Sequence, residues 1–109
     1  MRTWHLALMT SLSLILGTPQ PAAQSSATPA MARECAKLYF MYGGADAPES
    51  RLMLAKAAAM NGRSEADMAA DVTGMVDRSR RSIEEGRFEE SDSRLVFNAG
   101  CQQGYGITR

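Results

Sequence analysis

The residues with the most distinctive chemistry in this chain are two cysteines, Cys35 and Cys101, which enclose nearly the whole region able to fold. The segment before them has the pattern of an export signal, so both thiols would reach an oxidising compartment, where a disulfide is the expected state. The alternative is two independent thiols, either reactive or metal-binding. Neither a C-x-x-C redox pair nor a zinc cluster accompanies them.

A disulfide between these cysteines would close a long loop. In the chain-entropy description, such a closure stabilises the folded state by roughly 4 kcal/mol if the native geometry is unstrained. A domain of about 80 residues needs this contribution, because it buries too little apolar surface to be secure on core packing alone. We therefore expect Cys35 and Cys101 to be bonded to each other.

The amino terminus has the order of a secretory signal peptide. Arg2 supplies a short basic region, and an apolar run from Leu6 to Leu16 follows. That run is shorter than the roughly 20 residues that a spanning helix needs, which makes an uncleaved anchor the weaker alternative. We assign residues 1–26 to the signal peptide and its cleavage region, and residues 27–109 to a single small helical domain with a loose C-terminal tail.

Cleavage would remove Trp4 and the only histidine, His5. The mature chain would then lack every imidazole-dependent device, including the Ser-His-Asp and Cys-His nucleophilic sites and His-ligated zinc. Nucleotide-binding and calcium-binding loop motifs are also absent from the sequence. We therefore expect a non-enzymatic protein without a cofactor or a metal.

The charge balance excludes two further classes of partner. Without Arg2, eleven Lys and Arg residues remain against twelve Asp and Glu residues, which gives a net charge of −1. Nucleic acids and anionic membrane surfaces both require an excess of positive charge. We expect no nucleic-acid partner, and no stable membrane insertion after cleavage.

Other groups with possible chemistry favour structural interpretations. Acidic residues gather near Gly86, but they alternate with arginines and predict a solvated surface. Six methionines remain after cleavage, and several are spaced as helix core residues: Met31, Met41, Met53, Met60, Met68 and Met75. A methionine-lined groove between helices could nevertheless bind a small ligand or a metal, since thioethers are adaptable contacts and ligands of Cu(I). This small-ligand or metal binder is the alternative function.

Two clusters could contact a protein partner. The arginines at positions 78, 80 and 81 could meet an acidic partner, although neighbouring acids favour a solvated helix face. The aromatic group Tyr39, Phe40 and Tyr42 is crowded, because adjacent helical residues point about 100° apart and cannot all enter one small core. We single out these three residues as a candidate partner-binding patch, against the alternative of ordinary core and boundary packing.

Helix signals occupy the rest of the chain. Thr28 predicts the N-cap of a first helix with Pro29 at its first position, and Gly43-Gly44 ends it. Asp46 predicts the cap of a second helix, which ends at Asn61-Gly62. Ser64 predicts the cap of a third, regularly amphipathic helix that ends by Gly86. A fourth helix from Arg87 to about Gln103 would return Cys101 to the first helix, before the loose tail from Gly104.

Together these features predict an all-α fold: a small domain of three to four helices, stapled by one disulfide and preceded by a signal peptide. In size, export signal and cysteine placement, the chain is similar to two kinds of bacterial envelope protein, the small disulfide-linked acid-stress chaperones and the helical immunity proteins. This resemblance implies a periplasmic or secreted helical bundle that binds another protein in a stress-protective or inhibitory role. It assigns no functional residue.

Overall fold

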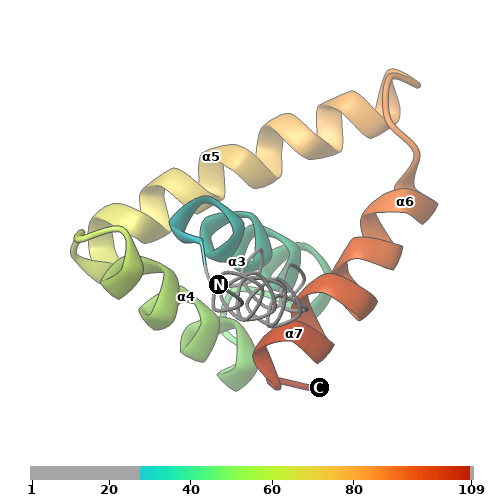
Figure 1. The fold of residues 1–109 in the computed structure, drawn as a ribbon. Helices are drawn as coiled ribbons and strands as arrows, with labels where there is room; N and C mark the ends of the chain where they lie inside the picture. Colours follow the sequence, from blue (N-terminus) through green and yellow to red (C-terminus); the bar gives the residue numbers. More distant parts are fainter. Residues whose placement is uncertain (1–27, 109) are drawn as a thin grey trace, which may run out of the picture.

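The structure, a computed structural model, describes residues 28–108. The predicted signal peptide of residues 1–26 lies outside the described residues. Within residues 28–108 every element is helical and no strand occurs, so the prediction of an all-α fold is confirmed (Figure 1). In chain order the elements are α3 (Pro29–Gly43), α4 (Pro48–Met60), α5 (Glu65–Glu84), α6 (Glu90–Leu95), the π-helix η1 (Val96–Gln102) and α7 (Gln103–Tyr105). The last three follow one another without a break.

The caps of α3 and α5 form as predicted. The Thr28 hydroxyl accepts a hydrogen bond from the backbone N–H of Met31 at 3.1 Å. The Ser64 hydroxyl accepts one from the N–H of Asp67, also at 3.1 Å. Each bond satisfies one of the donors that a helix start leaves without an intrahelical partner, which fixes where the two helices begin.

The predicted cap of α4 is wrong by one residue. The N-cap is Ala47 rather than Asp46, and it makes no side-chain capping bond. Pro48 decides this position. Its ring suits the first helical position, and the residue before a proline is held in the extended region, where Ala47 lies at φ −66° and ψ 144°.

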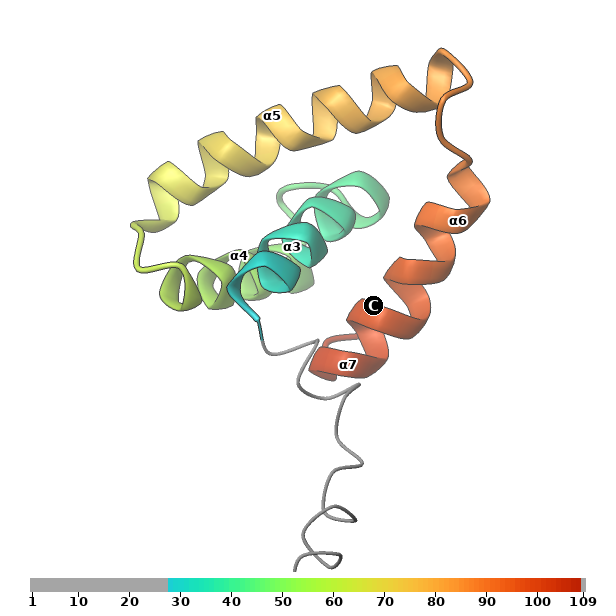
Figure 2. The ribbon, with the colours of Figure 1, turned by 45° about the horizontal axis from the view of Figure 1, so that its top comes forward.

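Helix α3 forms the centre of the domain, and α4, α5 and η1 all pack against it (Figures 1 and 2). Three of its residues, Ala32, Cys35 and Ala36, are fully buried, and small side chains there let the neighbouring helices approach. Met53 of α4 and Met68 of α5 are fully buried against this cluster. The described residues therefore form one hydrophobic core, built around α3. No helix within residues 28–108 is long and apolar enough to cross a membrane.

The predicted disulfide is present. Cys35 of α3 and Cys101 of η1 are bonded, with their Cα atoms 5.5 Å apart and a sequence separation of 66 residues. Both residues are fully buried. The bond therefore joins the central helix to the segment that ends the chain.

The C-terminal tail is not loose, which corrects the sequence-based expectation. Residues 103–105 are helical, and Ile107 is only 8% exposed within the core cluster. The backbone carbonyl of Ile107 accepts a hydrogen bond from the Tyr39 hydroxyl. Gly106 permits this return because it adopts a left-handed conformation, φ 69°, which other residues rarely take.

The second half of α5 and the chain from there to the start of η1 pack far less than the rest of the described chain. Among residues 77–96, Ser93 is the only buried side chain. Figure 2 shows the second half of α5 running past α3 and the chain turning into α6. We call residues 77–96 the corner segment. The first half of α5 holds one end of this segment and η1 holds the other, and burial of its own side chains contributes little.

Removal of the disulfide tests its contribution. The double variant Cys35→Ala/Cys101→Ala should lose about 4 kcal/mol of unfolding free energy, because the unfolded chain is no longer cross-linked. Urea unfolding monitored by circular dichroism measures this loss. Reductant should destabilise the wild type and leave the double variant unchanged. A loss below about 1 kcal/mol would contradict a stabilising role for the bond.

Truncation of Ile107 tests whether the tail belongs to the core. Ile107→Ala should lower the unfolding free energy by about 2 kcal/mol, since it removes buried methyl groups next to the Tyr39 bond. Its matched control is Thr108→Ala, because the neighbouring Thr108 is exposed. That change should stay within about 0.5 kcal/mol of the wild type. Equal effects of the two substitutions would restore the expectation of a loose tail.

Candidate binding site

The predicted aromatic patch of Tyr39, Phe40 and Tyr42 does not form as one exposed surface. Tyr39 is fully buried, with its ring edge-on to Phe97 at a centroid distance of 4.9 Å. Its position four residues after Cys35 is the signal that places it on the core face of α3. For Tyr39 the alternative of core packing is therefore correct, because η1 and the C-terminal residues cover that face.

Phe40 and Tyr42 are only partly buried. Tyr42 reaches across to the returning segment, with its ring 5.5 Å from that of Phe97 and the Arg94 guanidinium 4.4 Å above it. A cation over an aromatic face is an attractive pairing. The Tyr42 hydroxyl is buried and has no hydrogen-bond partner in the described part of the chain. A partner-binding role for Phe40 and Tyr42 stays a prediction.

One cavity lies beside Tyr42, between α3, the end of α5 and α6. Its volume is about 280 Å³. It is lined by Met41, Tyr42, Arg80, Ile83, Glu84, Glu90 and Arg94. Two arginines face two glutamates there, and Arg94 pairs with Glu90 at 3.4 Å. This balance gives the cavity no preference for a ligand of either charge.

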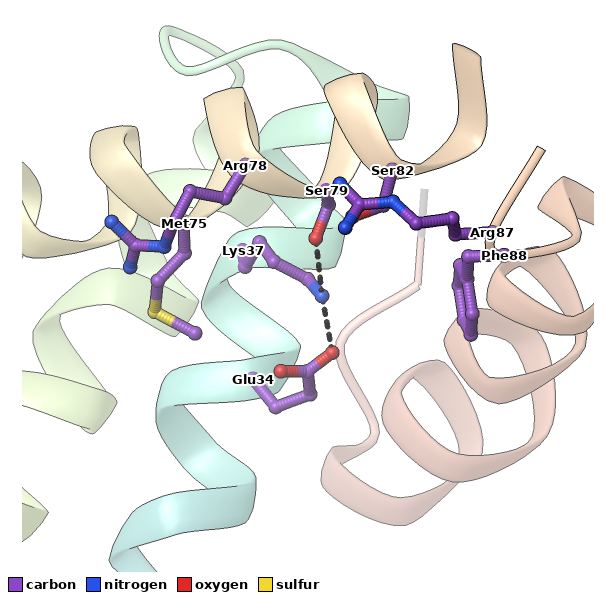
Figure 3. A pocket seen from close by; sticks show the side chains of 8 residues that line it. All are labelled: Glu34, Lys37, Met75, Arg78, Ser79, Ser82, Arg87 and Phe88. Atoms are coloured by element: carbon purple, nitrogen blue, oxygen red, sulfur yellow. Dashed lines mark hydrogen bonds and ion pairs between the residues drawn. The ribbon is translucent and has the colours of Figure 1, made fainter. Parts of the chain in front are cut away.

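A second, larger cavity of about 480 Å³ lies between α3, α5 and the turn after α5. We call it the α3–α5 cavity. Figure 3 shows the residues that line it: Glu34, Lys37, Met75, Arg78, Ser79, Ser82, Arg87 and Phe88. Three of these side chains carry a positive charge and one carries a negative charge. The sequence gives no local motif for this set, because it comes from three separate stretches of the chain.

Lys37 is the most buried charge of the α3–α5 cavity, with only 7% of the residue exposed. Its ammonium group donates to the Ser79 hydroxyl at 3.0 Å and forms an ion pair with Glu34. Burial of an ammonium group is costly unless it is paired and hydrogen-bonded, and these two contacts meet that requirement. Lys37 also ties α3 to the second half of α5.

The two arginines of the cavity are more exposed. Arg87 forms an ion pair with Glu85 at 2.5 Å, although its side chain stays 67% exposed. Arg78 folds back along α5 over Gly74, where an added Cβ would lie 3.3 Å from its Nη1. Gly74 thus leaves room for the Arg78 side chain within the helix.

Exposed apolar side chains concentrate in the corner segment. Four large hydrophobic residues are exposed among those described, and three of them belong to this segment: Phe88 (44%), Leu95 (64%) and Val96 (39%). The fourth, Leu52, lies on α4 and is 58% exposed. Phe88 also lines the α3–α5 cavity. Sequence periodicity did not identify these positions, because Leu95 and Val96 precede a buried phenylalanine in one apolar run.

Within the described part of the chain, neither the metal-binding side chains nor the methionines gather at a cavity. Within residues 28–108 no three His, Cys, Asp or Glu side chains are placed to hold a metal ion. Met53 and Met68 belong to the core. Met75 is the one methionine that lines the α3–α5 cavity, and Met41 lines the smaller one. Each cavity is therefore lined by four charged residues and one methionine.

Known proteins provide no functional residue to transfer. No protein-family profile matches the chain, and no curated protein or solved structure is significantly similar to it. The function is therefore inferred from the contacts of the chain itself.

Burial raises the pKa of the Tyr39 phenol, and the negative charge of Glu49 adds to the effect. Burial also raises the pKa of Tyr105. The folded state then holds these protons more tightly than the unfolded state. Their contribution to stability is present below the unfolded value of 10.0 and is lost as the pH rises from there through the folded pKa.

The free energy of unfolding should accordingly fall as the pH is raised above about 10. Urea unfolding across the alkaline range measures the slope. Tyr39→Phe should flatten the slope, and Tyr39→Phe/Tyr105→Phe should flatten it further, since neither replacement can ionise. A double variant that keeps the wild-type slope would show that other groups cause the alkaline loss.

Proposed function

We propose that this chain is a small exported protein, periplasmic or secreted, that acts without catalysis by binding another protein. The corner segment is its contact surface. The observation that carries the proposal is the concentration of Phe88, Leu95 and Val96 in a stretch that buries only Ser93. A stress-protective or inhibitory role, as in immunity proteins, fits a protein of this kind.

Single exposed hydrophobic residues are ordinary on protein surfaces, so their number alone carries little weight. Their location carries more. Full burial of a leucine or phenylalanine side chain stabilises by about 1.5–3 kcal/mol. The corner segment leaves Phe88, Leu95 and Val96 39–64% exposed while contributing almost nothing to the core. A partner that covers the exposed part of these side chains would gain a corresponding fraction of that free energy.

The surroundings of these residues suit a protein interface. Arg87, Glu89 and Glu90 are exposed beside them. Interfaces commonly combine a small apolar centre with a polar, hydrated rim. The buried disulfide supports export, because such bonds persist in oxidising compartments. The predicted signal peptide supports the same location.

Site-specific photo-cross-linking tests this function. A photoreactive amino acid placed at Leu95 in the producing cells should give a discrete cross-linked species with another protein. The matched control is Leu52, which is nearly as exposed and apolar but lies outside the corner segment. Cross-linking at Leu52 should be absent or diffuse.

Two results would contradict the proposal. The first is equal cross-linking at Leu95 and Leu52, which would indicate nonspecific apolar contact. The second is a product that contains only two copies of this chain. Mass spectrometry of the cross-linked species identifies both outcomes.

A second candidate function, small-ligand binding in a groove between helices, is favoured by the α3–α5 cavity. The chemistry of that cavity differs from the sequence-based expectation, because cationic and hydroxyl-bearing residues line it together with a single methionine.

A further inference from the structure

We propose that the α3–α5 cavity binds a small organic anion, a carboxylate attached to an apolar body. This inference gives the ligand class of the second candidate function and rests on that function, not on the protein-binding proposal, although Phe88 belongs to both surfaces. The ligand class follows from the charges, hydrogen-bond donors and apolar side chains of the cavity.

The charges of the cavity favour an anion. Lys37, Arg78 and Arg87 line it, against one carboxylate. That carboxylate, Glu34, is paired with Lys37, so the net positive charge of the cavity comes from its two arginines. The smaller cavity, with two arginines facing two glutamates, lacks this excess of positive charge. The preference therefore belongs to one cavity and not to the surface in general.

Hydrogen-bond donors are available where the anion would lie. An ammonium group carries three donors, and Lys37 uses two of them on Ser79 and Glu34. Ser82 adds a hydroxyl to the same wall. Hydrogen bonds from charged donors to a carboxylate are shorter and stronger than neutral ones. Figure 3 shows the Lys37 ammonium between Ser79 and Glu34, with Arg87 and Phe88 entering from the turn.

The pair formed by Arg87 does not block the site. Its partner Glu85 is 55% exposed, and Arg87 is 67% exposed. Ion pairs in such exposed positions are held weakly, because solvent screens them. An anion inside the cavity can therefore recruit the Arg87 guanidinium, whose planar donors match a carboxylate.

The apolar part of the ligand has two contacts. Phe88 and Met75 line the same cavity as the cationic groups. The volume of about 480 Å³ lies within the range of about 300–1,000 Å³ that is typical of small-molecule sites. An inorganic anion would leave most of this space and both apolar side chains unused. A carboxylate with an aromatic or aliphatic body uses both kinds of wall.

Nuclear magnetic resonance titration of the oxidised, mature chain tests the site with phenylacetate as the probe. Saturable shifts are expected for amides of Glu34, Lys37 and the residues around Ser82 and Phe88, with a Kd on the order of 1 mM. Phenylacetamide has the same shape without the charge and should not bind. Inorganic phosphate has charge without the apolar body and should bind at least about tenfold more weakly.

Charge-removing variants locate the site. Arg87→Gln should raise the Kd for phenylacetate by about tenfold, because it removes a charged donor. Arg78→Gln should raise the Kd less, because the Arg78 guanidinium folds back over Gly74 and points away from Lys37 in Figure 3. Arg81→Gln removes the same charge from an exposed residue of α5 that lines neither cavity and should leave the Kd unchanged. Lys37→Gln should abolish binding. Should it unfold the domain, the two exposed arginine variants still decide the outcome.

The proposal is overturned if phenylacetate gives no saturable shifts, or if phenylacetamide binds equally well. Equal weakening by Arg81→Gln would overturn it too, since attraction would then be diffuse. Equal affinity for phosphate would overturn the assigned ligand class.

The anion could come from a free acid or from an acidic side chain of a protein partner. Repeating the Leu95 cross-linking with Arg87→Gln distinguishes them. The yield falls if the partner supplies the carboxylate, and it is unchanged if the ligand is a free molecule.

Discussion

The fold depends on the buried disulfide between α3 and η1. Residues 77–96 bury only Ser93, so packing does little to hold the path from α5 to the end of the chain. Cys101 fixes the far end of that path to the central helix, and α5 fixes the near end. With both ends fixed, the corner segment can expose apolar side chains without contributing to the core. A segment with few buried side chains can be kept in a loop that a disulfide closes. The bond stabilises the fold by reducing the entropy of the unfolded chain, so it does not require additional native contacts.

The central position of α3 explains why it buries both a tyrosine, Tyr39, and a lysine, Lys37. Helices on three sides cover more than one face of α3, so Tyr39 is fully buried while Phe40 and Tyr42 lie at the edge of the core. Lys37 is covered for the same reason. A lysine on a surface helix would extend into water, whereas this one must find its partners inside the domain. Ser79 and Glu34 supply them, and the result is a cavity with a fixed cation in its wall.

Much of the architecture could be predicted because it is encoded locally. Thr28 and Ser64 cap their helices through the N–H three residues further on, a signal that can be read locally. The disulfide could be predicted because the chain has two cysteines and a predicted export signal. The misplaced cap of α4 is also a local matter, decided by Pro48 against Asp46. The α3–α5 cavity is different, since the bond from Lys37 to Ser79 spans 42 residues of sequence. The burial of Ile107 likewise depends on a contact with Tyr39, 68 residues away. No periodicity within one helix carries such information.

The two proposed binding events meet at Phe88. This residue is 44% exposed on the corner segment and also lines the α3–α5 cavity. A protein partner and a free ligand that each cover the Phe88 ring compete for this side chain. Linkage then requires that each weaken the binding of the other by the same factor. A carboxylate carried by the partner would instead make the two contacts parts of one binding event, because one molecule would cover Phe88 and reach the cationic wall together. A free acid would then compete with the partner for the cationic wall as well as for Phe88, so the coupling between a free acid and the partner is negative in both cases.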